Sequence, residues 1–211
     1  GTYLNDRRAL VAMWDPRHDL VKSNDGKDYP CNTQIMFWER DEDLHMTVTN
    51  RSNDMIWGAF GANAVHMSVL QEYMAGMLGY GIGNYYQFSN NLHAYVDVLK
   101  KLDGMQPQYE PYLTLGEDGL KYTPPALIDE PSTFDKELLE WFEDVDRLEY
   151  ENTYLGDTCA RMRLSWRYWK AKNYTNAYYH AHSIDDRAWR KACMEWLDRR
   201  LENTPGGSFL R

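Results

Sequence analysis

The residues best suited to chemistry are Cys31 and the run Arg51-Ser52-Asn53-Asp54, which begins twenty positions later. A thiol is a useful nucleophile only as the thiolate, and a nearby guanidinium favours that form. An arginine beside a hydroxyl side chain also offers the donors that a phosphate monoester needs. Together with Asn63 on a predicted helix, these residues indicate an enzyme that attacks a nucleotide.

Two predicted strands position the cysteine and the arginine. Residues 33–38 and 44–49 are rich in β-formers, and the second run alternates apolar and polar side chains. The charged residues 40–43 between them predict a tight hairpin turn. Because an antiparallel hairpin brings its open ends together, we expect Cys31 and Arg51 to be spatial neighbours.

The other elements of the first half follow from periodicity and from turn residues. Apolar residues from Val65 to Met77 recur every four positions, which predicts a helix, and Gly79 ends it. The remaining predictions are a strand at 9–14, a loop at 17–29, a helix at 63–78, an extended segment at 85–95 and a short helix at 96–102. These elements predict an α/β (α+β) fold with an antiparallel or mixed sheet packed against helices.

The second half reads as a C-terminal α-helical extension. Five prolines between residues 107 and 131 predict a connector. Amphipathic helices are predicted at 134–150, 157–171, 176–184 and 187–201, with Trp166, Trp169, Trp189 and Trp196 burying a small bundle. The expected domains are a catalytic core at 1–105, a connector at 106–132, a helical extension at 133–203 and a flexible tail at 204–211.

Composition excludes several classes of function. The net charge of −9 argues against a nucleic-acid polymer as partner, but a single nucleotide needs only a few local arginines. The three cysteines are too far apart in sequence for a disulfide framework or a paired metal site, so we expect no metal and a reducing, cytoplasmic compartment. No apolar run is long enough to cross a membrane. We also expect that residues are missing upstream of Gly1.

Five motifs, in order and at near-family spacing, resemble the thymidylate synthase family, which includes the pyrimidine hydroxymethylases of phages. The motifs are Arg7-Arg8 followed by a strand and Trp14, Pro30-Cys31, Arg51-Ser52-Asn53-Asp54, the helix bearing Asn63, and Asn91-Leu92-His93-Ala94-Tyr95. The resemblance covers roughly residues 5–102. The chain departs from the family pattern at Asn32, Asn50 and Asn91, and by one extra residue between Gly58 and Asn63.

The resemblance implies a role for each matched residue. Cys31 would add to C6 of a pyrimidine ring, while Arg51 and Ser52 would hold the 5′-phosphate. Asp54 would lie near the pyrimidine and the folate, and Asn63 would bind the polar edge of the base. His93 and Tyr95 would bind the 3′-hydroxyl of the deoxyribose. Arg7 and Arg8 would reach the phosphate of the other subunit, because the family forms obligate homodimers with shared active sites.

The resemblance also implies a reaction, the transfer of a one-carbon unit from 5,10-methylenetetrahydrofolate to C5 of a pyrimidine deoxynucleotide. A carboxamide presents a donor and an acceptor that match N3–H and O4 of uracil, so Asn63 favours dUMP over dCMP. Because Asn63 favours dUMP, the main expectation is methylation with hydride from the folate, as in thymidylate synthesis. Hydroxymethylation of dUMP or dCMP, with water in place of hydride, is the alternative. A nucleotide-binding relic without turnover is the non-enzymatic alternative.

Overall fold

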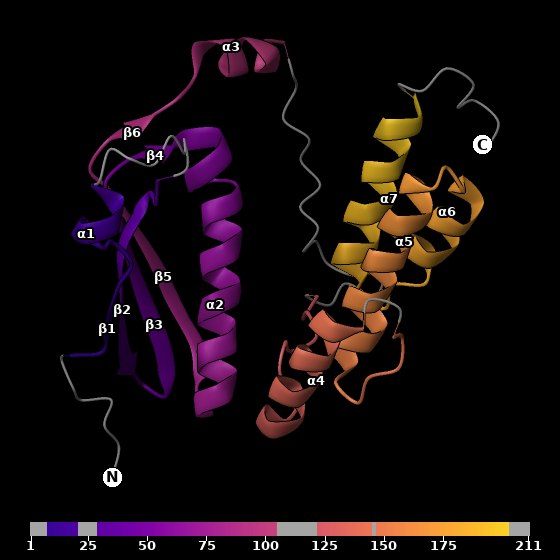
Figure 1. The fold of residues 1–211 in the computed structure, drawn as a ribbon, viewed down its shortest axis with the longest axis horizontal. Coiled ribbons are helices and arrows are strands. Elements are labelled where there is room, and N and C mark those ends of the chain that lie inside the picture. Colours follow the sequence, from indigo (N-terminus) through magenta and orange to yellow (C-terminus); the bar gives the residue numbers. More distant parts are fainter. Residues whose placement is uncertain (1–7, 21–28, 105–121, 145–146, 203–211) are drawn as a thin grey trace. The chain divides into compact units, whose positions relative to one another are not determined.

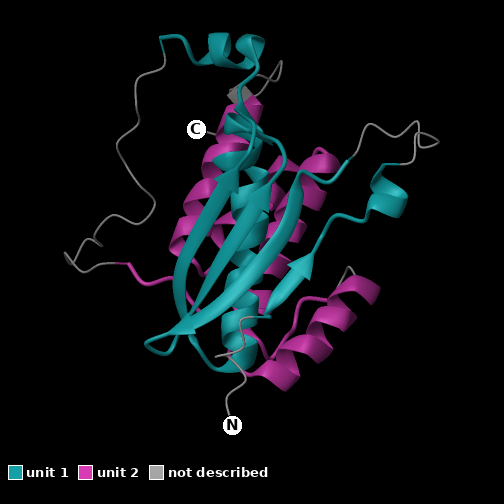
Figure 2. Ribbon diagram, turned by 90° about the vertical axis from the view of Figure 1, so that its left-hand side faces the viewer, with its two compact units in different colours: residues 1–106 teal, residues 107–211 magenta. Residues whose placement is uncertain are grey.

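The computed structural model describes residues 8–20, 29–104, 122–144 and 147–202. The chain divides into two compact units, Gly1–Gln106 and Pro107–Arg211 (Figure 2). Each unit has a hydrophobic core of its own. The residues proposed to carry chemistry all belong to unit 1.

The centre of unit 1 is an antiparallel hairpin. Strands β2 (Asn32–Arg40) and β3 (Asp43–Asn50) pair from Arg40 opposite Asp43 to Asn32 opposite Asn50. Asp41 and Glu42 both have positive φ, 55° and 68°, as a two-residue hairpin turn of type I′ requires. The predicted hairpin and its turn are confirmed.

Two further strands make the sheet mixed. Strand β1 (Leu10–Ala12) pairs antiparallel with β2, and β5 (Gly81–Ser89) pairs parallel with β3, which gives the order β1-β2-β3-β5. A parallel pair needs a crossover connection, and α2 (Ala62–Leu78) supplies it. Strand β5 begins earlier than the predicted extended segment. Position 83 of this strand has room only for glycine, because a Cβ atom there would lie 2.8 Å from the His45 ring.

Helix α2 covers one face of the sheet (Figure 1). Met67 packs against Ile35, Met46 and Val48 to form the core of unit 1. Gln71 lies inside this interface, where its Nε2 donates to the carbonyl oxygens of Leu44 at 2.8 Å and Gly83 at 3.0 Å. The predicted helix is confirmed, and Gly79 ends it in the left-handed conformation with φ of 74°.

The buried amide of Gln71 gives a prediction about stability. Gln71→Met keeps the side-chain volume but leaves two strand carbonyls without this donor, so the free energy of unfolding should fall by about 1–3 kcal/mol. Urea denaturation measures the change. Ser68→Ala on the exposed side of the same helix is the control and should stay within about 0.5 kcal/mol of the parent protein. An equal loss in both variants would contradict the role given to Gln71.

Short elements gather at the end of the sheet where α2 begins (Figure 1). Strand β4 (Asn53–Asp54) pairs parallel with β6 (Leu92–His93), and a π-helical turn, η2 (Met55–Ala59), leads into α2. The predicted short helix is present as α3 (Val96–Leu99) followed by the 3₁₀ turn η3 (Lys100–Leu102).

The loop predicted from residue 17 begins instead with a short helix, α1 (Pro16–Asp19). The side chain of Asp15 caps it by accepting from the backbone N–H of Arg17 at 2.9 Å. Residues 21–28 of the predicted loop lie outside the described residues.

Unit 2 is helical. Its elements are α4 (Pro131–Glu143), the π-helical η4 (Tyr154–Ala160), α5 (Arg161–Lys170), α6 (Tyr174–His182) and α7 (Arg187–Glu202). The prediction carried the first helix to residue 150, which is wrong. The buried carboxylate of Glu137 accepts from the backbone N–H groups of Glu151 and Asn152, which requires the chain to turn back after the helix.

Tryptophans contribute unequally to the core of unit 2. Trp169 and Trp196 meet edge to face, with ring centroids 4.8 Å apart, and pack against the buried Ala177 and Leu197. Trp166 is 53% exposed, so the prediction that all four rings bury the bundle is wrong at this position.

Among the helices that the structure describes, none has both the length and the apolar character that a membrane-spanning helix needs.

Candidate active site

Cys31 and Arg51 meet at the open end of the β2–β3 hairpin, so the predicted neighbourhood is confirmed. The backbone N–H of Arg51 donates to the carbonyl oxygen of Cys31 at 3.0 Å. Cys31 is partly exposed, and its Sγ makes a long hydrogen bond of 4.0 Å to the carbonyl oxygen of Tyr29. The guanidinium of Arg51 donates to the same carbonyl oxygen, so the thiol and the arginine share this contact.

The side chain of Arg51 is held in place but keeps donors for an anion. Its Nε donates to the carbonyl oxygen of Pro30 at 2.9 Å, and an Nη donates to that of Tyr29 at 3.3 Å. The guanidinium carbon also lies 5.3 Å from the ring centroid of Trp14. A guanidinium has five N–H donors. The two hydrogen bonds recorded among the described residues therefore leave the exposed edge of Arg51 available to a phosphate.

Two of the residues that depart from the family pattern, Asn32 and Asn50, are hydrogen-bonded to each other. Asn32 and Asn50 are both buried and face each other across the hairpin, where Nδ2 of Asn32 donates to Oδ1 of Asn50 at 2.8 Å. Asn50 in turn donates to the carbonyl oxygen of Phe88 on β5 at 3.2 Å. The two asparagines therefore tie β2, β3 and β5 together directly beneath the cysteine.

Ser52 and His93 come together through the pairing of β4 with β6. Nδ1 of His93 lies 3.5 Å from Oγ of Ser52 and 3.4 Å from the carbonyl oxygen of Asn91. Tyr95 meets the His93 ring edge to face, with centroids 5.5 Å apart. With Nδ1 turned inward, Nε2 of His93 remains for a ligand hydroxyl.

Asp54 combines a structural contact with an unused acceptor. Its Oδ1 accepts from the backbone N–H of Trp57 at 2.5 Å and so caps the π-helical turn. Its Oδ2 is buried and has no hydrogen-bond partner among the described residues. A buried carboxylate oxygen without a donor is costly unless a ligand supplies one.

Asn63 lies in the first turn of α2, and its Nδ2 donates to Oδ1 of the buried Asn53 at 3.0 Å. Phe60 donates its backbone N–H to the carbonyl oxygen of Met55, five residues back, at 3.1 Å. This wide turn takes up one more residue than an α-helical turn does. It therefore gives the extra residue before Asn63 a place outside α2.

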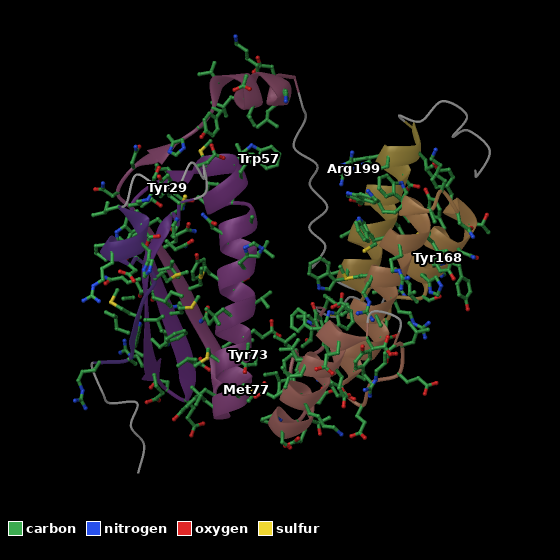
Figure 3. All side chains as sticks on the ribbon, viewed as in Figure 1. Tyr29, Trp57, Tyr73, Met77, Tyr168 and Arg199 are labelled. Carbon is green, nitrogen blue, oxygen red and sulfur yellow. The ribbon has the colours of Figure 1, made fainter. Side chains whose placement is uncertain are left out.

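Apart from Arg8, the predicted site residues that the structure describes share one end of unit 1. Figure 3 shows Tyr29 and Trp57 at this end, and Tyr73 and Met77 toward the other end of α2. Arg8 is exposed ahead of β1. Because Leu10 pairs with Met36 and Ala12 with Gln34, Arg8 lies toward the hairpin turn and not beside Cys31 within this chain. The predicted Arg7 lies outside the described residues. Asn53 and Gln87 were not predicted as site residues, although Asn53 stands inside the Arg51 motif. The described residues contain no cluster of potential metal ligands.

Comparison with known proteins identifies the family of the chain. The family model described as thymidylate synthase matches residues 2–122, more than half of the chain. The chain belongs to the thymidylate synthase family. The resemblance carried by the five motifs is thereby confirmed.

Individual members of the thymidylate synthase family match different shares of the chain. A deoxyuridylate hydroxymethyltransferase of Pseudomonas phage M6 is 35% identical over 93% of this chain and 58% of its own length. A thymidylate synthase of Streptococcus gordonii is 37% identical over 43% of this chain and 32% of its own. The thermostable thymidylate synthase A from Bacillus subtilis is 29% identical, with a TM-score of 0.39, over 47% of this chain and 35% of its own. The chain thus spans little more than half of the phage relative.

Proposed function

We propose that this chain transfers a one-carbon unit from 5,10-methylenetetrahydrofolate to C5 of dUMP. The observation that carries the proposal is the convergence of a partly exposed thiol, Cys31, with the Arg51 and Ser52 pair at one end of unit 1. Arg51 and Ser52 would bind the 5′-phosphate, and Ser52 lies beside His93, which with Tyr95 would bind the sugar. A reducing compartment such as the cytoplasm would keep the thiol free.

The proposed chemistry begins at the thiolate. Cys31 would form a bond from Sγ to C6 of the pyrimidine, and the electron pair of the C5–C6 double bond would move to C5 and onto O4 as an enolate. Asn63 at the polar edge of the base would stabilise that charge with an N–H donor. Once C5 carries the new carbon and has lost its proton, elimination of the Cys31 thiolate would restore the double bond.

The folate co-substrate fits one feature of the site in particular. The buried Oδ2 of Asp54 has no donor from the described residues, and a pteridine ring carries N–H groups that could supply one. When bound, methylenetetrahydrofolate supplies the one-carbon unit at the oxidation level of formaldehyde. Asp54, fixed through Oδ1 to the turn η2, would orient this ligand.

The two possible products differ in the step after one-carbon transfer. The phage hydroxymethyltransferase matches 207 residues and so extends into unit 2, whereas the streptococcal thymidylate synthase matches 94. This coverage favours the hydroxymethyl product, formed with water. Methylation, with hydride from the folate, remains the second candidate because the family model described as thymidylate synthase covers the unit that carries Cys31.

Mass spectrometry of the nucleotide product tests the proposal. The chain is incubated with dUMP and methylenetetrahydrofolate, and with dCMP in parallel. A product from dUMP that carries a hydroxymethyl group supports the first candidate, and one that carries a methyl group supports the second. Unchanged dUMP under conditions in which dUMP binds would support a non-catalytic nucleotide-binding protein and contradict the proposal.

The proposal includes a homodimer, and the sheet of unit 1 offers a surface for it. Alternate side chains of β5 face α2, while Tyr86 and Phe88 on the opposite face are 40% and 64% exposed. Leu10 on β1 is also exposed. No described helix of unit 1 covers these side chains, and an apolar sheet face of this kind is a common interface between subunits.

A charge on this sheet face should prevent association. Phe88→Glu would place a carboxylate between two apolar sheets, and its desolvation without a partner should raise the dimer dissociation constant at least about 100-fold. Sedimentation velocity measures the change. Leu102→Glu, at an exposed apolar residue away from the sheet, is the control and should leave the dimer dissociation constant unchanged. A dimer that survives Phe88→Glu would place the interface elsewhere.

A further inference from the structure

Three carboxamides from three different elements form a continuous chain behind the proposed base site. Asn63 on α2 donates its Nδ2 to Oδ1 of Asn53 on β4 at 3.0 Å. Asn53 donates its own Nδ2 to Oε1 of Gln87 on β5, and to Oγ of Ser89 at 3.1 Å. Gln87 donates Nε2 to the backbone carbonyl oxygen of Ala59 at 3.3 Å. These residues, Asn63, Asn53, Gln87 and the Ala59 carbonyl, are called the amide relay below.

The Ala59 carbonyl gives the relay a fixed direction. A backbone carbonyl can only accept, so Gln87 must turn its nitrogen toward Ala59 and its oxygen toward Asn53. Asn53 must then present nitrogen to Gln87 and oxygen to Asn63. Asn63 must in turn present its nitrogen to Asn53. Each amide could rotate alone, but the carbonyl at the end of the relay cannot exchange donor for acceptor.

The packing leaves little room for another arrangement. Asn53 has no exposed surface. A Cβ atom at Gly58 would lie 2.1 Å from Oδ1 of Asn53 and 3.0 Å from Nδ2 of Asn63, so only glycine permits the contact between the two amides. Gly58 and Ala59 both belong to the turn η2, which therefore supplies both the end of the relay and the space beside it.

The direction matters because a carboxamide free to rotate can pair with either pyrimidine. Uracil presents a donor at N3 and an acceptor at position 4, and cytosine presents the reverse. A half-turn of the Asn63 amide would convert one match into the other. With the relay in place, that half-turn sets two oxygens against each other somewhere between Asn63 and Ala59. A buried polar atom left without its hydrogen bond shifts an equilibrium by about 10- to 100-fold.

We propose that Asn53 and Gln87 are positioning residues that hold the Asn63 carboxamide in the orientation that accepts uracil and rejects cytosine. The proposal rests on the proposed function, since it takes Asn63 as the residue that binds the base. It adds that the preference belongs to the anchored relay and not to Asn63 alone.

Two substitutions at Gln87 separate direction from packing. Gln87→Met has a similar volume but neither donates nor accepts in this way, so Asn53 and Asn63 become free to turn together. Gln87→Glu still presents an acceptor to Asn53 and keeps the direction. The measurement is the ratio of dissociation constants for dCMP and dUMP by calorimetry, with circular dichroism and thermal melting to follow folding.

Gln87→Met should reduce the dCMP-to-dUMP ratio about 10-fold or more, chiefly through tighter binding of dCMP, whereas Gln87→Glu should keep it within about threefold. If Gln87→Met does not fold, Gln87→Ala should show the same loss, because water at the vacated position can donate or accept. A folded Met or Ala variant with the parent ratio would overturn the relay proposal while leaving the proposed function intact. A parent protein that binds neither nucleotide would overturn both.

Discussion

Cys31→Ala is expected to abolish turnover of dUMP, with kcat falling on the order of 10⁴-fold or more. The reason is that Cys31 is the only cysteine among the described residues of unit 1, and the loss of a covalent nucleophile leaves only the binding contribution to catalysis. Affinity for dUMP should change much less, because the phosphate and sugar contacts come from other side chains. Release of tritium from C5 of labelled dUMP measures turnover, and calorimetry measures affinity.

The other two cysteines provide the control. Burial raises the pKa of Cys159 to about 12 and also raises that of Cys193, so both are neutral thiols at neutral pH. Cys159→Ala and Cys193→Ala should therefore keep their turnover, apart from any loss of folded protein. Turnover that survives in Cys31→Ala, or that disappears equally in all three variants, would remove Cys31 from the mechanism.

Arg51→Ala is expected to weaken dUMP binding by about 1.5–3 kcal/mol, or about 10- to 150-fold, because a charged hydrogen bond to the phosphate is lost. Deoxyuridine has no phosphate, so its much weaker affinity should hardly change. The comparison of nucleotide and nucleoside in one variant separates loss of the phosphate clamp from general damage to the site. Calorimetry with both ligands provides the measurement.

Arg51 also supports the backbone at Tyr29 and Pro30, so a control for stability is needed. Arg51→Lys keeps the charge but lacks the planar fork, and we expect it to fall between the parent protein and Arg51→Ala in dUMP affinity. Arg40→Ala, at an exposed arginine of the hairpin turn, should leave binding unchanged. Equal losses for dUMP and deoxyuridine in Arg51→Ala would show that the arginine acts through the fold and not through the phosphate.

The parts of unit 1 that could be predicted are those governed by local pattern. Alternation of side chains and a charged turn were enough to place Cys31 beside Arg51, and a four-residue apolar repeat placed the helix of Asn63. The end of α4 could not be predicted in this way. It depends on the carboxylate of Glu137, which accepts hydrogen bonds from backbone N–H groups fourteen and fifteen residues further along the chain. The helical pattern of the sequence gives no sign of these bonds.

The hydrogen bonds between buried side chains behind the site could not be predicted from the sequence either. Asn53 and Gln87 are 34 residues apart, and their hydrogen bond exists only because folding brings β4 within side-chain reach of the end of β5. The hydrogen bond from Asn32 to Asn50 could not be predicted for the same reason, since two separate departures from the family pattern become partners only after folding. Predicting such contacts requires the sheet register in addition to the motifs.

The central claim is that a dUMP molecule lies against the Cys31 sulfur. Alkylation of the three cysteines by iodoacetamide, followed peptide by peptide with mass spectrometry at neutral pH, tests this. Cys31 should react fastest, and saturating dUMP should slow its alkylation at least about tenfold, with Cys159 and Cys193 as internal references in the same sample. Alkylation of Cys31 at an unchanged rate when dUMP is bound would place the nucleotide away from the sulfur and contradict the claim.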